Sequence, residues 1–120
     1  KSYELAKKFS KDAKGRLGDI VNTTLIENGT EADFDFIAQN YNDAPPSEEK
    51  LGLSENFCDY LNKVNDITKV KTGIDYIISF RNMIPSQFRS FTDAAFRKGF
   101  DKLSKTKGKE IEDYIEKSMK

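Results

Sequence analysis

The sequence contains no histidine, no tryptophan and a single cysteine among its 120 residues. The lack of histidine excludes the commonest general base, the Ser-His and Cys-His nucleophile pairs, and most zinc and di-iron sites. The single cysteine, Cys58, excludes an internal disulfide, a CxxC redox pair and a thiolate metal site. A lone cysteine on an apolar stripe is typical of a small core residue, and the lack of disulfides favours a reducing, cytoplasmic compartment.

Long apolar runs are missing as well. The longest weakly polar run, Tyr76 to Phe80, is far shorter than the roughly 20 residues that a transmembrane helix needs, and no signal peptide is visible. The chain begins at Lys1 rather than at methionine, which is typical of a processed product or a fragment of a longer chain. Its length predicts one domain, residues 1–120.

The chain has no net charge, since 20 basic residues balance 20 acidic ones. No overall field therefore attracts nucleic acid or a membrane. The charges are unevenly distributed, with net +4 over residues 1–16, −9 over 17–60, +7 over 61–109 and −2 over 110–120. This asymmetry indicates a polar molecule, acidic on one part and basic on another.

Apolar residues recur at steps of three and four along nearly the whole chain, which predicts helices. Thr30 is expected to open one helix through a capping box with Asp33, Ser54 to cap the next, and Pro85 to begin a later one. We find no strand signal, so the sequence predicts an all-α fold, a compact bundle of five to six short-to-medium helices with no sheet. The side chains expected in its core include those of Phe9, Ile77, Ile78, Phe88 and Phe91.

The remaining chemistry rests on carboxylates and lysines. Asp33 and Asp35 fail as a calcium loop, because the glycine at the sixth position and the closing glutamate are missing. The glycines are scattered and form no phosphate-binding loop. The sequence therefore predicts no catalytic residue, no cofactor and no metal site. An enzyme based on Lys, Tyr or Asp leaves no local signature and stays an alternative.

Lysines form a second candidate site. Many charged residues alternate in sign at steps of four along the expected helices, as on an ordinary solvated helix face. The lysines that this pattern does not account for form a candidate basic patch: Lys7, Lys11, Lys14, Lys98, Lys102, Lys107 and Lys109. Brought together by the fold, they would suit an anionic surface such as lipid headgroups or nucleic acid.

Phe36 is the candidate for a partner contact. At about 100° per residue, its ring points some 160–200° away from the apolar stripe of its own helix. Either the helix is covered on two sides and Phe36 is packed there, or Phe36 is an aromatic anchor for a partner. In the second interpretation, Asp33 and Asp35 select a basic partner.

By elimination, the sequence favours a non-catalytic helical module that binds another protein, such as an adaptor, an inhibitor or immunity-type protein, or a regulatory domain. The alternative function is binding to an anionic surface through the candidate basic patch. A second alternative is an enzyme without histidine.

Overall fold

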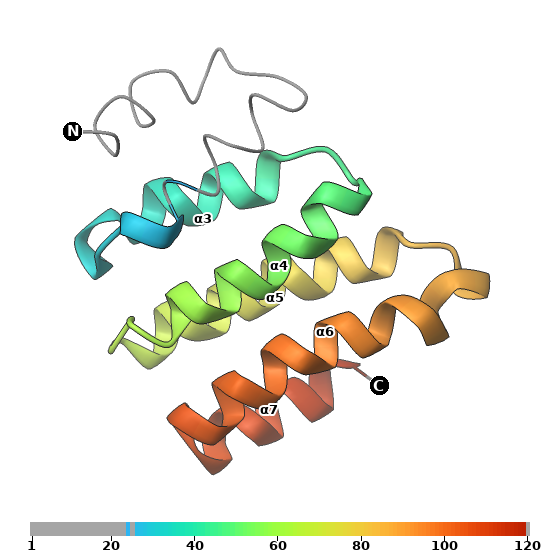
Figure 1. The fold of residues 1–120 in the computed structure, drawn as a ribbon. Helices are drawn as coiled ribbons and strands as arrows, with labels where there is room; N and C mark the ends of the chain where they lie inside the picture. The colour runs from blue at the N-terminus through green and yellow to red at the C-terminus, as the bar shows by residue number, and fades with distance from the viewer. Residues whose placement is uncertain (1–23, 25, 120) are drawn as a thin grey trace.

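The computed structural model describes Thr24 and residues 26–119. One 3-10 turn and five α-helices follow one another along residues 31–119, and the described residues include no strand (Figure 1). The elements are η1 (Glu31–Asp33), α3 (Phe34–Asp43), α4 (Glu48–Leu61), α5 (Ile67–Met83), α6 (Ser86–Lys107) and α7 (Lys109–Met119). The predicted compact all-α fold is confirmed for this part of the chain.

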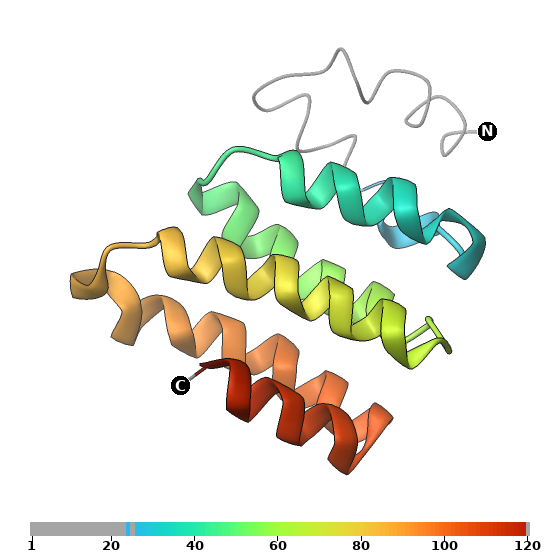
Figure 2. The same ribbon diagram turned by 180° about the vertical axis from the view of Figure 1, so that it is seen from behind.

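The helices form two layers. Helices α4 and α6 lie side by side in one layer, while α3, α5 and α7 form the other (Figures 1 and 2). Helix α6 packs on both α4 and α7, so it joins the C-terminal hairpin to the rest of the molecule. None of the described helices is both long and apolar enough to cross a membrane.

Short polar side chains set the helix ends. The predicted capping box is confirmed, because the Asp33 carboxylate accepts hydrogen bonds from the backbone N–H (3.4 Å) and the hydroxyl (3.2 Å) of Thr30. Asp66 opens α5 by accepting the N–H groups of Thr68 (2.9 Å) and Lys69 (3.4 Å). At the other end of the chain, Gly108 separates α6 from α7 with a φ of 93°, a conformation that favours glycine.

The core lies between the two layers and contains the predicted Ile77 and Ile78. Tyr41 stacks on Phe57 with ring centroids 4.5 Å apart, and Phe80 meets Phe96 edge-on at 5.8 Å. The other large, fully buried side chains are Ile37, Tyr60, Leu61, Ile74, Phe100, Leu103, Ile111 and Ile115. Phe9, also predicted for the core, lies outside the described residues.

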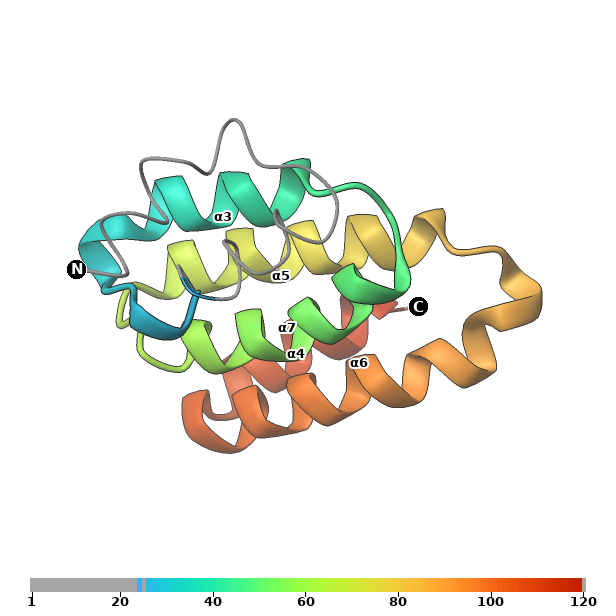
Figure 3. The same cartoon turned by 45° about the horizontal axis from the view of Figure 1, so that its top comes forward.

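The prediction that Phe88 and Phe91 belong to the core is wrong. Both side chains are exposed, Phe88 by 52% and Phe91 by 79%. The buried face of α6 begins at Thr92, and Phe91 lies about 100° around the helix from that residue. Phe88 is close to the same face as Thr92 but one turn earlier, where α6 extends beyond the ends of α3 and α4 (Figure 3).

The expected role of Ser54 as a helix cap is also wrong. Helix α4 begins earlier, at Glu48, and the hydroxyl of Ser47 caps it by accepting the N–H of Lys50 at 3.2 Å. The composition of residues 42–53 predicts a loop there, but residues 48–53 belong to α4. Ser54 is buried instead, hydrogen-bonded to the Tyr41 hydroxyl and to the backbone carbonyl of Lys50.

Candidate functional site

The two acidic residues near Phe36 in the sequence, Asp33 and Asp35, differ in their surroundings. Asp33 closes the turn with Thr30, whereas Asp35 is exposed. Phe36 itself is half-buried and packs against the hydrophobic core. The ring is thus partly covered, and a role for Phe36, Asp33 and Asp35 in binding a partner stays a prediction.

The lysines of the candidate basic patch have intramolecular partners. The Nζ atom of Lys102 lies 2.7 Å from a carboxylate oxygen of Glu55 and 3.7 Å from one of Asp59, and that of Lys98 lies 3.8 Å from Glu55. Hydrogen bonding to Lys102 holds the pKa of the Glu55 carboxyl below its usual value.

The other two described lysines of the patch are engaged as well. Lys107 donates to the backbone carbonyl of Val64, and Lys109 pairs with Asp113 at 3.1 Å. The charges of all four described lysines are therefore shared with neighbouring groups. Lys7, Lys11 and Lys14 lie outside the described residues.

Lys50 is a buried cation that the sequence analysis missed. Its side chain is 3% exposed, and its ammonium donates to the backbone carbonyls of Asn42 (3.2 Å) and Ala44 (2.8 Å). The same ammonium lies about 5 Å from the ring centroids of Tyr41 and Phe80. Burial lowers the pKa of Lys50, while the nearby Asp43 partly opposes that shift.

Lys50, Ser54 and Tyr41 are residue types that occur in catalytic sites, but here none of the three is accessible from the surface. The hydroxyls of Ser54 and Tyr41 bond to each other, and Ser54 donates to the Lys50 carbonyl at 2.7 Å. All three residues are buried, and burial raises the pKa of Tyr41. The cluster therefore joins the end of α3 to α4 and offers no surface to a substrate.

The most unusual surface lies where α5 meets α6. Met83 is 61% exposed, and with Phe88 and Phe91 it makes up the large hydrophobic side chains that the described part of the molecule exposes. We call these three residues the apolar corner. The sequence predicted Phe88 and Phe91 for the core, because apolar spacing does not show which face of α6 other helices cover.

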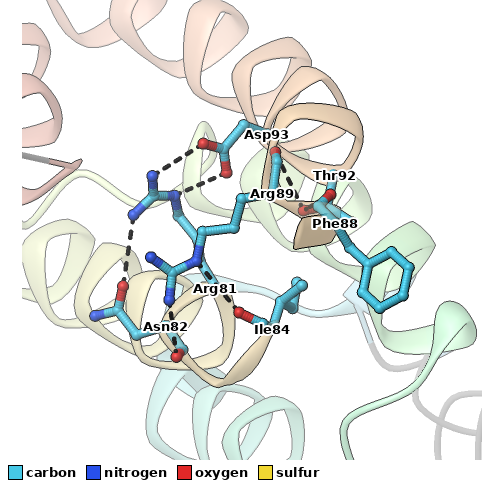
Figure 4. A network of polar contacts seen from close by, with 7 residues as sticks. All are labelled: Arg81, Asn82, Ile84, Phe88, Arg89, Thr92 and Asp93. Carbon is cyan, nitrogen blue, oxygen red and sulfur yellow. Dashed lines mark hydrogen bonds and ion pairs between the residues drawn. The ribbon is translucent and has the colours of Figure 1, made fainter. Parts of the chain in front are cut away.

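Two arginines hold the apolar corner in place (Figure 4). Arg81 forms a two-pronged ion pair with Asp93, with N–O distances of 2.8 and 2.9 Å, which ties α5 to α6. Arg89 donates to the backbone carbonyls of Ile84 and Asn82, both at 3.2 Å. Carbonyls at the end of a helix lack intrahelical partners, so Arg89 completes the C-terminus of α5.

The chain segment that carries the apolar corner contains few charged residues. One residue in three of the whole chain is charged, yet the fifteen residues from 82 to 96 contain only Arg89 and Asp93. Both of these side chains are bound internally. Figure 4 shows the ring of Phe88 pointing away from this polar network. The segment that carries the apolar corner is therefore held by internal contacts, and its two charged side chains are bound within the molecule.

Other kinds of site are not evident in the described ranges. No group of three or more cysteine, aspartate or glutamate side chains there is placed to hold a metal ion. Cys58 is 2% exposed, and burial raises the pKa of its thiol to about 12, so it is a packed core residue rather than a nucleophile. Comparison of the chain with protein-family models, curated proteins and solved structures found no match.

Proposed function

We propose that this chain is a non-catalytic helical module that binds another protein chain, and that the apolar corner is its contact surface. The observation that carries the proposal is the exposure of Met83, Phe88 and Phe91 in a segment, residues 82–96, whose only two charged side chains are bound internally. The centres of protein interfaces are depleted in charged residues and enriched in aromatic residues and methionine. The apolar corner has this composition.

The rigidity of the apolar corner supports the same function. Ordering a flexible segment on binding reduces affinity, whereas a preorganised surface avoids that cost. The Arg81–Asp93 ion pair and the two hydrogen bonds of Arg89 fix the backbone that carries the exposed side chains. Two phenylalanines on successive turns of a fixed helix are suited to act as the anchors that dominate binding energy.

The alternative functions receive less support. Binding to an anionic surface needs lysines that are free to meet phosphates, but Lys98, Lys102, Lys107 and Lys109 all have internal partners. Catalysis without histidine would need an accessible activated group, but the Lys50 cluster is closed. Contact through Phe36 stays a second, separate prediction.

The proposal is tested by comparing which proteins the immobilised chain retains with and without its exposed rings. Replacement of Phe88 or Phe91 by alanine should weaken binding by about 2 kcal/mol, roughly thirty-fold, as loss of an interface anchor does. Because both side chains are exposed, melting temperatures should stay near that of the original chain.

Phe36→Ala is the comparison variant, because Phe36 is a half-buried phenylalanine elsewhere on the molecule. It should leave binding through the apolar corner unchanged. If the variants at Phe88 and Phe91 retain the same proteins with the same affinity, the apolar corner is not the contact surface. If only Phe36→Ala loses binding, the acidic segment around Asp33 and Asp35 is the contact instead.

A further inference from the structure

We infer that residues 82–91, which we call the corner segment, open and close as a local unit, and that the Arg81–Asp93 ion pair is the contact that keeps them closed. The corner segment includes the connection from α5 to α6 and carries the three side chains of the apolar corner. Local opening is a property of the chain itself, whereas its consequence for binding rests on the proposed function.

The corner segment buries little of its surface. None of its ten residues has a buried side chain, and Ile84 and Arg89 are the two that are partly buried. Ile84 packs against the hydrophobic core, whereas the side chains of the apolar corner are exposed. A segment with few buried apolar contacts opens at a smaller cost in free energy than the core does. Burial therefore does little to keep the corner segment closed.

Polar contacts close the corner segment instead (Figure 4). Arg81 and Asp93 lie just outside its two ends, and their side chains are only 12% and 28% exposed. Two hydrogen bonds, of 2.8 and 2.9 Å, join the guanidinium to the carboxylate, an arrangement that is stronger than a single charged contact. Arg89 donates to the carbonyls of Asn82 and Ile84, which both belong to the corner segment. Arg89 therefore fixes the shape of the segment, while the ion pair closes it.

The helices beside the corner segment are held by apolar contacts of their own. The last buried side chain of α5 is that of Phe80, and the buried face of α6 begins at Thr92 and continues through Phe96. The rings of Phe80 and Phe96 meet edge-on at 5.8 Å. This contact keeps α5 and α6 together when the residues between them open. Loss of the ion pair should therefore release the corner segment without unfolding the core.

Closure of the corner segment matters for the proposed function, because a partner that binds a disordered segment must also order it, which lowers the affinity. The ion pair orders the segment when the chain folds, before a partner binds. Arg81 and Asp93 are thus positioning residues, which act on the contact surface through the backbone and do not belong to the apolar corner.

The first test follows amide hydrogen exchange by NMR at several low urea concentrations and needs no variant. The N–H groups of Phe91 and Thr92 report on the corner segment, because helical N–H groups bond to carbonyls four residues earlier. We expect these two amides to exchange faster than those of Phe96 and Phe100, which are buried in α6. Their exchange should also respond less to urea, because local opening exposes less surface than unfolding does. Equal urea dependence at all four amides would overturn the inference, since the segment would then open only with the whole molecule.

The second test changes the ion pair. Arg81→Glu and Asp93→Arg each place two like charges together, and each should speed exchange at Phe91 on the order of tenfold. The double variant carries the reversed ion pair and should restore slow exchange. Lys71→Glu is the matched control, because it breaks an ion pair with Glu110 near the other end of α5, and it should leave exchange at Phe91 unchanged.

Exchange at Phe91 that stays the same in both single variants, or that the double variant does not slow again, would contradict the inference. Failure of the proposed function is a separate result. If Phe88→Ala and Phe91→Ala retain the same proteins with the same affinity, while exchange depends on the ion pair as expected, the proposed function is wrong and the inference stands. If those variants lose binding but exchange does not depend on the ion pair, the inference alone is wrong.

Discussion

Lys50 shows how a single charged side chain can join two helices from inside the molecule. Its ammonium lies at the C-terminal end of α3, where it hydrogen-bonds the carbonyls of Asn42 and Ala44. Helix ends leave such carbonyls without partners and carry partial negative charge, so a cation there is stabilising. Its aliphatic stem is at the same time packed in the core.

Removal of this side chain should therefore cost both packing and hydrogen bonds. We expect Lys50→Ala to lower the free energy of unfolding by about 2–4 kcal/mol, because it leaves a cavity and two unpaired carbonyls. Urea unfolding followed by circular dichroism measures the change. Lys105→Ala is the control, because Lys105 is exposed, and its effect should stay within about 0.5 kcal/mol. Equal effects of the two substitutions would show that Lys50 does not support α3.

The positions of Lys50 and Ser54 could not be predicted from the sequence. Lysine is usually exposed and serine is common at helix caps, so the local pattern favours a loop ending at Ser54. The structure differs because two distant groups, the Tyr41 hydroxyl and the carbonyls at the end of α3, satisfy these side chains in the core. Tyr41 is thirteen residues from Ser54 in the chain, and Asn42 is eight residues from Lys50. Partners at these separations leave no local signal in the sequence.

At the scale of the helices, the sequence predicted the boundaries at Thr30 and near Pro85 but not the start of α4 or the buried face of α6. Thr30 and Pro85 indicate boundaries because their effects are local. In α6, steps of three and four fit the stripe through Phe88 and Phe91 as well as the buried face through Thr92 and Phe96. Only the packing of α6 on α4 and α7 decides between them.

That packing predicts opposite effects for two glycines. A Cβ atom on Gly99 would lie 2.9 Å from the Sγ atom of Cys58, whereas one on Gly52 would meet nothing within 4 Å. We expect Gly99→Ala to destabilise the protein by about 1–3 kcal/mol through overpacking of α4 against α6. Gly52→Ala should stabilise it by about 0.5–1 kcal/mol through its higher helix propensity. Chemical denaturation of the two variants measures both changes.

A third variant identifies the clash. Adding Cys58→Ala to Gly99→Ala removes the sulfur atom nearest to the new methyl group. The double variant should lose less stability than the two single effects add up to. If the effects are additive, the crossing of α4 and α6 is not limited by this contact.

At the scale of the whole molecule, the sequence indicated the all-α architecture and the uneven charge, but not the apolar corner. Phe91 is exposed because it lies off the buried face of α6, and Phe88 because it lies in the first turn of α6, where the helix extends beyond α3 and α4 (Figure 3). Relative helix position is a tertiary property that apolar spacing does not encode. The internal partners of Lys98 and Lys102 could not be predicted for a similar reason, because Glu55 and Asp59 reach these lysines from another helix.

Titratable groups with shifted pKa values make stability depend on pH in the alkaline range. The folded molecule raises the pKa values of Tyr41 and Tyr60, chiefly by burial, and that of Tyr114 to about 12, chiefly by its hydrogen bond to Asp75. Burial raises the pKa of Cys58 to about 12 as well. Unfolded chains lose these protons at lower pH than the folded molecule does, so the folded state binds more protons and stability falls as pH rises.

Lys50 acts in the opposite direction, since burial lowers its pKa. The unfolded chain then binds the extra proton, and this term raises stability as the pH approaches the ordinary lysine value. The groups with raised pKa values outnumber Lys50, so we expect the urea midpoint to fall above about pH 10, where tyrosines of the unfolded chain ionise. Tyr41→Phe has no phenol to titrate and should flatten this decline, although loss of the bond to Ser54 lowers its stability at neutral pH. A midpoint that stays constant to about pH 11.5 would show that the tyrosines ionise as easily in the folded molecule as in the unfolded chain.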